Sequence, residues 1–403
     1  MKRVIFHIDV NSAFLSWSAV SLLKEGKDDI RLVPSVVSGS PQKRTSVVLA
    51  KSIPAKEYGI KTGEPIGLAL KKCPTLFITP PSFSLYSKYS KEFKDICREY
   101  TPLLEEFSID ECFLDMSGME HMYPDITDAA YIIKDRIKNE LGFTVNVGIG
   151  SNKLLAKMAS DFEKPDKVHT LFDYEVEEKM WCLPIDDLLF LGKASAAKLK
   201  SLSVNTIGDL AHADINMIKA VIGGKFGEQL HRYANGIDDS PVSNEKREAK
   251  SYGHSITVEE DLTDIETADA LLLALSDAAA SRMRRKGCKA YNISVNIRDR
   301  NFRNKSHQRQ LGSPTDVTAD IYKIAKELLR EVWADRTPLR LIGVSLSDVT
   351  KEGGEQLTLF DSAEESSKKQ KVDAAVDAIR NKYGKSKIVL GSTLGKKMPK
   401  NKE

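Results

Sequence analysis

Apolar residues follow two regular spacings through the first half of the chain. The run R-V-I-F-H-I at 3–8 predicts a buried strand, and from Ser12 to Leu23 the apolar positions follow the period of a helix. Between 82 and 172 the same criteria predict a helix at 85–100, a strand pair at 105–115, a helix at 129–141, a strand at 144–149 and a helix at 153–162. With the first strand, the order β-α-β-β-α-β predicts a ferredoxin-like domain.

The remaining regions show three further patterns. Residues 30–80 contain short strand-like pieces joined by the turn-rich segments G-S-P and T-G-E-P, which indicates a small inserted subdomain. The pattern at 182–236 is helical, and glycines open two of these helices, as in helix-hairpin-helix units whose backbone N–H groups can hold a phosphate. After a polar linker at 237–250, a second α/β domain is predicted from a helix at 267–286 and strands at 291–300 and 339–346.

Length and composition limit the number of domains and the class of protein. The chain of 403 residues is expected to form two to four domains, and 60 Lys+Arg against 57 Asp+Glu leave a formal net charge of only +3. The five cysteines form no C-x-x-C pair, and the first apolar run is too short for a signal peptide or a membrane span. A soluble protein of the reducing cytoplasm is therefore expected. The seven histidines show no metal-binding spacing, and most of them are expected at the surface or at helix caps.

Positive charge is concentrated in the second domain. Between Arg282 and Arg309 there are ten Lys or Arg residues and one acid, Asp299, which leaves a net charge of +9 over 28 residues. Such a density favours contact with the phosphate backbone of a nucleic acid, and a solvated basic face is the alternative. Because no aromatic residues are interleaved with the charges, base stacking is expected to be secondary.

Three acids stand where a core strand normally avoids charge. Asp110 and Glu111 are adjacent in F-S-I-D-E-C-F-L-D, and Asp9 ends the first strand. Because the two central strands of a ferredoxin-like sheet are neighbours, the three carboxylates are expected to converge and to need a cation, and oxygen ligands favour Mg²⁺ or Mn²⁺. Two such ions could activate a hydroxyl and stabilise a leaving pyrophosphate. The alternative is an ordinary hairpin turn, with Asp9 at a strand end or helix cap.

A series of motifs occurs in order over nearly the whole chain. They are D-V-N-S-A-F (9–14), K-S-I-P-A-K-E-Y-G-I-K-T-G-E-P (51–65), A-L-K-K-C-P (69–74), S-I-D-E-C-F-L-D (108–115), V-G-I-G-S-N-K-L-L-A-K-M-A-S-D-F-E-K-P (147–165), the helix-hairpin-helix at 191–199, K-S-Y-G-H (250–254) and Q-L-T-L-F (356–360). In these motifs the chain resembles the Y-family, DinB/UmuC-like translesion DNA polymerases.

The resemblance implies an α+β multidomain fold with a ferredoxin-like palm, small fingers, a helix-hairpin-helix thumb and an α/β little finger. The implied bounds are 1–20 and 80–172 for the palm, 21–79 for the fingers, 173–236 for the thumb, 237–250 for a linker, 251–349 for the little finger and 350–403 for a tail. The implied activity is template-directed, Mg²⁺-dependent addition of deoxynucleotides to a primer 3′ end, across damaged template and without proofreading. The expected partners of this monomer are primer-template DNA and dNTPs.

Individual roles are also implied by the resemblance. Asp9, Asp110 and Glu111 would be the catalytic metal ligands, joined by the backbone carbonyl of Val10. Phe14 would be the steric gate against a ribose 2′-OH. The triphosphate would contact Lys56 and Lys164, whereas the role of Lys153 is left open. The residues expected to contact DNA are Gly192, Lys193, Arg298, Arg300 and Arg303.

Four positions depart from the family pattern. Many relatives have Tyr at the position of Ile53 and Arg at that of Lys56, so a hydroxyl donor and a bidentate fork are missing here. Asn11 replaces a second Asp, and Phe190 stands where the hairpin motif often has its first Gly. The expected consequences are nucleotide binding that is either weaker or supplied by other residues, and a changed thumb contact.

The tail contains a further motif. Q-L-T-L-F resembles the peptide by which bacterial polymerases bind the sliding clamp, with Gln356, Leu357, Leu359 and Phe360 as its contact residues; a short apolar strand is the alternative. A helix with apolar positions from Val372 to Tyr383 follows, with no contact assigned. Two rival functions stay open: a nucleotide cyclase on a palm fold, which would not need the basic domain, and a non-catalytic DNA-binding scaffold, which would not need the carboxylates.

Overall fold

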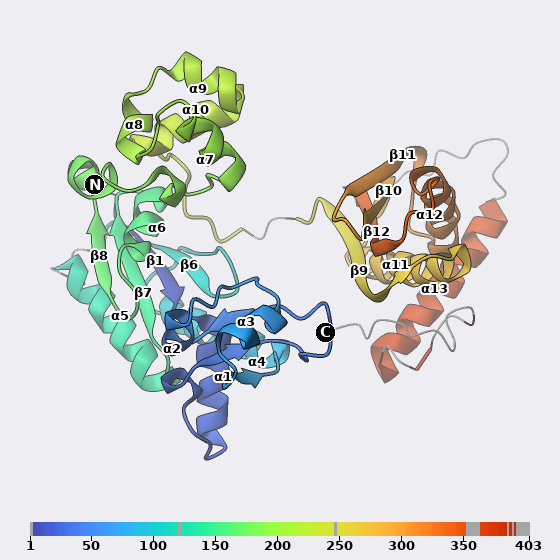
Figure 1. Ribbon diagram of the computed structural model, residues 1–403, viewed down its shortest axis with the longest axis horizontal. Helices are drawn as coiled ribbons and strands as arrows, with labels where there is room; N and C mark the ends of the chain where they lie inside the picture. Colours follow the sequence, from blue (N-terminus) through green and yellow to red (C-terminus); the bar gives the residue numbers. More distant parts are fainter. Residues whose placement is uncertain are drawn as a thin grey trace. The chain divides into compact units, whose positions relative to one another are not determined.

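The computed structural model describes residues 3–351, apart from 120–121, 124 and 246–247, together with 363–384, 387–388 and 391. The chain divides into two compact units, Met1–Gln42 with Ser46–Lys246 and Lys43–Thr45 with Arg247–Glu403 (Figure 1). Each unit has its own apolar core.

A five-stranded sheet forms the centre of the first unit. Its order is β5-β6-β1-β7-β8, built from Leu104–Glu106, Glu111–Asp115, Ile5–Val10, Val145–Gly150 and Val168–Leu171. Strand β1 is antiparallel to both β6 and β7, and β8 adds a parallel edge strand. The first four strands have the order of a ferredoxin-like fold, which confirms the predicted fold class.

Alternation along β1 gives the sheet two different faces. Phe6, Ile8 and Val10 point to an apolar core formed with α1 (Ala13–Lys24), α4 (Phe83–Arg98) and α5 (Ile126–Leu141). His7 and Asp9 are also buried but have polar partners on the opposite face, against α6 (Lys153–Asp161). The segment expected to be a linker also packs on this face, because its residue Val242 belongs to a small apolar cluster with Ile5.

Two smaller groups of elements complete the first unit. The first is a three-stranded sheet of order β3-β2-β4 (Ala50–Lys51, Ser35–Val37, Phe77–Thr79), with α2 (Ile53–Glu57) and α3 (Ile66–Lys72). The second contains α7 (Lys193–Lys200), α8 (Ile207–His212), α9 (Ile215–Ile222) and α10 (Gly224–Ala234), packed around a shared apolar cluster. Short helical turns lie at Ile30–Leu32, Asp173–Glu175, Val176–Met180 and Ile185–Asp187.

The second unit is a four-stranded antiparallel sheet covered by helices. Its order is β11-β10-β12-β9, from Asn304–Thr315, Lys289–Asp299, Leu339–Thr350 and Ser251–Leu262. Inward residues of β10 and β12 pack against α11 (Ile265–Arg284) and α12 (Thr318–Val332). The sequence analysis predicted β10, β12 and α11 but not the two edge strands or α12. Strand β11 is largely exposed and polar, whereas β9 and α12 carry apolar residues at strand and helix spacing that were not assigned.

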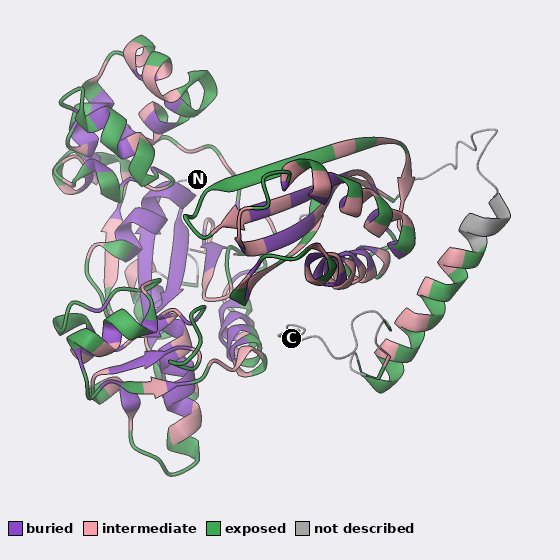
Figure 2. Cartoon of the chain, turned by 45° about the vertical axis from the view of Figure 1, so that its right-hand side comes forward, coloured by how far each residue is buried: buried purple, intermediate pink, exposed green. Residues whose placement is uncertain are grey.

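The last helix, α13 (Ala363–Tyr383), binds the second unit through its polar side chains. Asp377 lies 2.8 Å from Arg284, and Asp373 accepts a hydrogen bond from the Thr318 backbone N–H at 2.8 Å. Asp373 thereby caps α12, whose own N-cap residue, Val317, has no side-chain acceptor. Apolar positions of the expected amphipathic face instead lie exposed, as Figure 2 shows along α13; Val372 is 62% and Tyr383 58% exposed.

Asp373→Ala is expected to lower the free energy of unfolding of the second unit by about 2 kcal/mol. The reason is that α12 loses its cap and Arg284 loses one of its two acidic partners. Urea denaturation of the full chain measures the change. The control is Lys371→Ala on an exposed part of the same helix, expected to change stability by less than about 0.5 kcal/mol. Unchanged stability of Asp373→Ala would contradict this role.

Candidate active site

Two adjacent strands place the predicted acids at one end of the sheet. Asp9 of β1 is the direct cross-strand partner of Glu111, the first residue of β6. The Val10 backbone N–H donates to the Asp110 carbonyl at 3.1 Å, so the backbone of Asp110 lies beside that of Val10. The antiparallel register of β1 and β6 therefore brings segments that are about a hundred residues apart in sequence to one place.

Asp9 is buried between two lysines. Only 6% of the residue is exposed, its carboxylate contacts the Lys164 ammonium group, and Lys157 Nζ lies 3.8 Å from Oδ2. Burial raises the pKa of Asp9 above its ordinary value, although the positive charges of the two lysines oppose that change. Burial alone would lower the pKa of Lys164, but the carboxylates of Asp9 and Asp161 have a larger, opposite effect and raise it to about 12.

Glu111 has a different environment although it is the neighbour of Asp9. Lys157 Nζ lies 3.1 Å from one carboxylate oxygen, and His7 Nε2 lies 3.6 Å from the other. Partial burial alone would raise the pKa of Glu111, but the contacts with His7 and Lys157 lower it to about 2. Glu111 is thus ionised at any physiological pH.

Asp110 is oriented by its own loop. Its carboxylate accepts a hydrogen bond from the Ser108 hydroxyl at 2.6 Å. Among the described residues, no three His, Cys, Asp or Glu side chains are grouped closely enough to hold a metal ion. The structure therefore brings the side chains of Asp9 and Glu111 together and leaves that of Asp110 outside the group. Carboxylate and carbonyl oxygens are the ligands that Mg²⁺ takes, so the chemistry of this donor set fits that ion.

The glycines of V-G-I-G explain how α6 reaches this site. A methyl group on Gly148 would lie 2.0 Å from the Ala156 carbonyl oxygen, and one on Gly150 would lie 2.6 Å from the Ala156 nitrogen. Only glycine therefore permits the helix to lie this close to β7. The close packing allows Lys157 to reach Glu111, and it lets Lys153 form an ion pair with Glu105 of β5 at 2.7 Å.

The remaining nucleotide-site candidates lie on α1 and α2. Phe14 stacks on Tyr86 with ring centroids 4.6 Å apart, so its orientation is fixed by packing. Lys56 and Ile53 are exposed on α2. Lys51 lies next to them and was given no role in the sequence analysis. Its pKa is lowered mainly by burial and then by the positive charge of Lys56.

Two of the departures have a structural account. The side-chain oxygen of Asn11 accepts hydrogen bonds from the Thr144 hydroxyl at 2.9 Å and from the Asp166 backbone at 3.0 Å, so Asn11 joins the end of β1 to two neighbouring segments. Phe190 has a φ of 67°, a left-handed backbone conformation that glycine adopts most easily. The phenylalanine therefore keeps the backbone shape that the hairpin motif requires, at some cost in strain.

The DNA-contact candidates lie in both units. Gly192 is the N-cap of α7, and Lys193 is its first residue. In the second unit Arg300 and Arg303 are exposed, whereas the Arg298 guanidinium donates to the Asn304 side chain at 2.7 Å.

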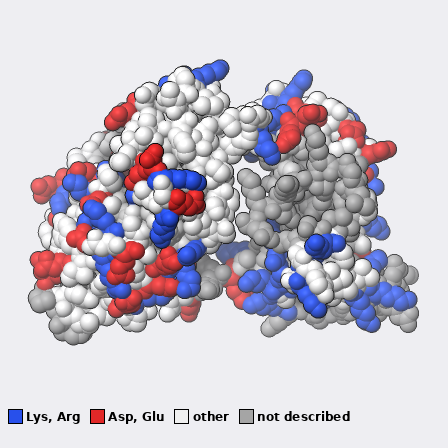
Figure 3. Space-filling model, turned by 90° about the horizontal axis from the view of Figure 1, so that it is seen from below, with Lys and Arg blue, Asp and Glu red and all other residues white. Residues whose placement is uncertain are grey.

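The basic run of the second unit is partly neutralised. Lys305 pairs with Asp335 at 2.6 Å, Arg309 with Glu331 at 2.9 Å, and Arg284 with α13. Figure 3 shows positive and negative side chains next to one another on the first unit, whereas positive side chains prevail in the lower right part of the view, on the second unit. Acids distant in sequence thus neutralise Arg284, Lys305 and Arg309, and the expected contact of the basic run with a nucleic acid stays a prediction.

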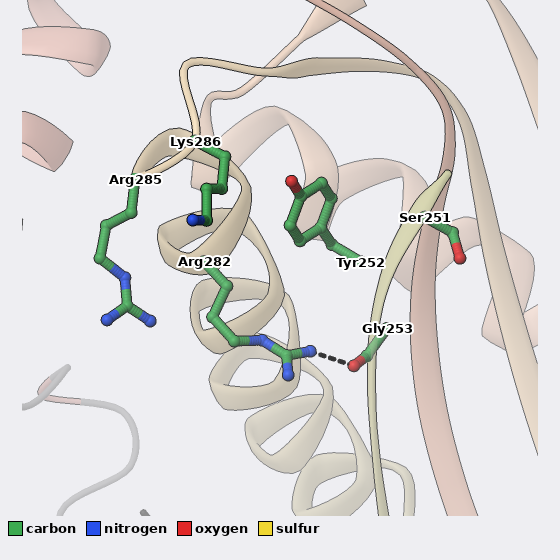
Figure 4. A pocket seen from close by; sticks show the side chains of 6 residues that line it. All are labelled: Ser251, Tyr252, Gly253, Arg282, Arg285 and Lys286. Atoms are coloured by element: carbon green, nitrogen blue, oxygen red, sulfur yellow. Dashed lines mark hydrogen bonds between the residues drawn. The ribbon is translucent and has the colours of Figure 1, made fainter. Parts of the chain in front are cut away.

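A cavity of about 580 Å³ is lined by three further cations of that run, Arg282, Arg285 and Lys286. Figure 4 shows Arg282 and Lys286 at the end of α11 on the side of the first residues of β9, whereas the side chain of Arg285 points away from that strand. The Arg282 guanidinium donates to the carbonyl of Gly253 on that strand. The sequence pattern located these cations but not the cavity between the two elements.

Sequence reasoning missed two residues beside the acids. His7 is fully buried and so is not among the histidines that lie at the surface or at a cap. Its position two residues before Asp9 on a strand was the available signal, since such residues share a face. Lys157 lies four residues after Lys153 and so on the same helix face, but its partner cannot be read from the sequence. The peptide 356–360 lies outside the described residues.

Comparisons with known proteins agree with this arrangement. Models of the impB/mucB/samB family match residues 8–161, models of its C-terminal domain match 249–359, and a DNA polymerase-iota thumb-domain model matches 187–238. The chain belongs to this family, the Y-family of translesion DNA polymerases.

The similar curated proteins are bacterial DNA polymerases IV. The chain is 45% identical to that of Clostridium acetobutylicum over 98% of this chain and 99% of the relative, and 37% identical to that of Clostridium kluyveri over 98% and 99%. A solved Y-family DNA polymerase chimera containing Dbh has the same fold, with a TM-score of 0.75, 24% identity and coverage of 87% of this chain and 100% of that one. No helix among the described residues is long and apolar enough to cross a membrane.

Gly148→Ala is expected to destabilise the first unit by about 3 kcal/mol or more, because the added methyl would overlap the backbone of α6. Lys157 would also move away from Glu111, so primer extension should fall with stability. Thermal unfolding and extension assays measure the two effects. Gly67→Ala is the control, since its methyl meets no atom within 4 Å. Equal melting temperatures for Gly148→Ala and wild type would show that α6 is not held this closely.

Proposed function

We propose that this protein extends a primer 3′ end across damaged template at the end of β1 and β6, with Asp9, Asp110 and Glu111 as metal ligands and the Val10 carbonyl as a fourth donor. The observation that carries the proposal is the pairing of Asp9 with Glu111 on adjacent strands, in a member of a DNA polymerase family. Two divalent ions, Mg²⁺ or in its place Mn²⁺, supply charge stabilisation for the attacking oxygen and the leaving pyrophosphate.

The lysines around the acids suit a triphosphate. Lys164 contacts Asp9, is partly exposed, and stays protonated at neutral pH because its pKa is about 12. A fixed positive charge at this place stabilises charge that develops on the departing phosphate groups. Lys56 contributes from α2, and Lys51 beside it compensates in part for the hydroxyl that Ile53 lacks.

The sugar of the nucleotide is selected by shape. Phe14 packs against Tyr86 and against Phe83, whose ring centroid lies 6.2 Å from its own. These contacts prevent the Phe14 ring from rotating to make room for a larger sugar. A 2′-OH would therefore meet a ring held in place by the palm core. This rigidity supports the role of Phe14 as the steric gate that favours deoxynucleotides.

The second unit offers DNA a flat polar surface. On the sheet face opposite the helices, Asn296 of β10 lies beside Gly343 of β12, which in turn lies beside Ser255 of β9. A Cβ on Gly343 would be 2.5 Å from the Asn296 side chain, so this surface is packed with small groups. Small neutral side chains let a DNA backbone approach closely, and Arg298, Arg300 and Arg303 at one end supply positive charge.

The thumb and the tail add further contacts. Gly192 and Lys193 at the start of α7 present backbone N–H groups and a cation to a phosphate. Gln356, Leu357, Leu359 and Phe360 bind the sliding clamp, and the enzyme works as a monomer in the cytoplasm without proofreading. A cyclase or a non-catalytic scaffold is disfavoured by family membership together with the paired acids.

Asp110→Asn is expected to reduce primer extension by at least about 100-fold on both undamaged and abasic templates, because one charged metal ligand is lost. Gel analysis with Mg²⁺ and labelled primer measures it. Asp128→Asn, at an exposed position of α5, is the control and should extend like wild type. Full activity of folded Asp110→Asn would mean that the metal site is elsewhere.

Replacing both Leu359 and Phe360 with Ala is expected to abolish stimulation by the sliding clamp and to leave clamp-free extension unchanged. The apolar anchors are lost, whereas the palm is untouched. Product-length distributions with and without clamp separate the two effects. Thr358→Ala in the same peptide is the control. Stimulation that survives the double change would locate the clamp contact outside this peptide.

A further inference from the structure

Two buried asparagines lie beside Asp9, at the end of strand β1. Asn146 of β7 is the cross-strand partner of Asp9 on the side opposite Glu111, and Asn11 follows Asp9 by two residues along the chain. Asn146 is fully buried, and Asn11 is 9% exposed. A buried amide needs partners for its oxygen and for its N–H groups, so the contacts of these two side chains show which neighbouring segments they hold.

The two amides bind each other and fix each other's orientation. The Asn11 amide donates to the Asn146 side-chain oxygen at 3.0 Å. The Asn146 amide donates to the backbone carbonyls of Ser160 at 3.1 Å and Glu163 at 2.6 Å, and the Asn11 oxygen accepts from the Asp166 backbone N–H at 3.0 Å. Turning either amide by half a rotation would set oxygen against oxygen or N–H against N–H, so only one arrangement satisfies all of these groups.

These hydrogen bonds hold the loop that carries Lys164 on both sides of that residue. The Glu163 carbonyl lies one residue before Lys164, and the Asp166 N–H lies two residues after it. The ammonium group of Lys164 contacts the carboxylate of Asp9. The amide pair thus joins the ends of two neighbouring strands to the loop and keeps the lysine beside the acids.

The asparagine at position 11 suits this arrangement better than the aspartate of the family pattern. An Asn11→Asp side chain could still accept from the Asp166 N–H, but it has no N–H for the Asn146 oxygen. Two oxygens would then face each other across the 3.0 Å contact. The departure at position 11 therefore has its counterpart in Asn146.

We propose that Asn11 and Asn146 are positioning residues that hold Lys164 at the triphosphate site. Because the loop is fixed by buried groups of the sheet, the positive charge is in place before the nucleotide binds, and little reorganisation is needed. The inference rests on the proposed assignment of Lys164 as a triphosphate contact. A role in packing alone would change stability without changing nucleotide affinity through Lys164.

The experiment measures the Kd of a non-hydrolysable deoxynucleotide for the full chain with primer-template DNA and Mg²⁺. Asn146→Ser keeps a hydroxyl on β7 but cannot replace both N–H groups of the amide. Thr144→Val is the matched control, because the Thr144 hydroxyl donates to the same Asn11 oxygen at 2.9 Å but has no printed contact with the loop. We expect about tenfold weaker binding for Asn146→Ser and a change below about twofold for Thr144→Val.

Two outcomes of this comparison would overturn the proposal. The first is wild-type affinity in folded Asn146→Ser. The second is an equal loss in Thr144→Val, because any break in the polar cluster would then have the same effect.

A double-mutant cycle tests whether the asparagine acts through Lys164. In a Lys164→Ala background, Asn146→Ser is expected to weaken binding by less than about a further twofold, because the charge that it positions is gone. A further loss as large as in the wild-type background would overturn the proposal. Lys164→Ala also separates the two levels of inference. If it leaves affinity unchanged, the assignment of Lys164 fails; if it weakens binding while Asn146→Ser does not, only the role of the asparagines fails.

Hydrogen–deuterium exchange of the wild type covers the case in which the variants do not fold. The backbone N–H of Asp166 lies in a loop, yet it is expected to exchange slowly because its acceptor is the buried Asn11 side chain. Exchange of this amide at the rate of an unstructured peptide would overturn the proposal.

Discussion

The close approach of α6 to the central sheet is the constraint on which the described site depends. Gly148 and Gly150 allow it, because any side chain there would overlap the helix backbone. Glycine in a strand carries an entropic cost and removes packing surface, so two of them in a buried strand weaken the sheet locally. In return, polar ends of α6 side chains reach β1 and β6. The two glycines of V-G-I-G therefore determine how closely α6 packs on the sheet. This close packing brings the charged side chains of α6 within reach of the acids on the strands.

Burying charge against this sheet is not a route to stability. Ion pairs withdrawn from water lose hydration, and apolar replacements of similar size are often as stable. The neighbours Asp9 and Glu111 also respond differently to burial: the pKa of Asp9 is raised, whereas that of Glu111 falls to about 2 because it has a partner on each oxygen. Such an uneven pair is more easily explained by a role in chemistry than by a structural role.

Much of the fold could be predicted from the sequence, because buried strands such as β1 are rich in apolar residues and the order of elements fixed the ferredoxin-like topology. The edge strand β11 escaped because most of its residues are exposed and polar, whereas β9 was missed although Tyr252, Ile256 and Val258 alternate along it. Within the site, the acids were found because charge is conspicuous in an apolar run. His7 was not, because its neighbours Ser160 and Glu111 are brought to it only by folding.

The attachment of α13 determines how the pentapeptide can be presented. Strand β12 ends at Thr350 and α13 begins at Ala363, and both elements are held by the same unit. The two ends of the intervening chain therefore belong to one unit, and chain length alone limits the distance from these ends to its midpoint to roughly 20 Å, at about 3.4 Å per residue. A partner that binds there is kept within that radius of the second unit, and tension on the intervening chain would be borne by the ion pairs of Arg284.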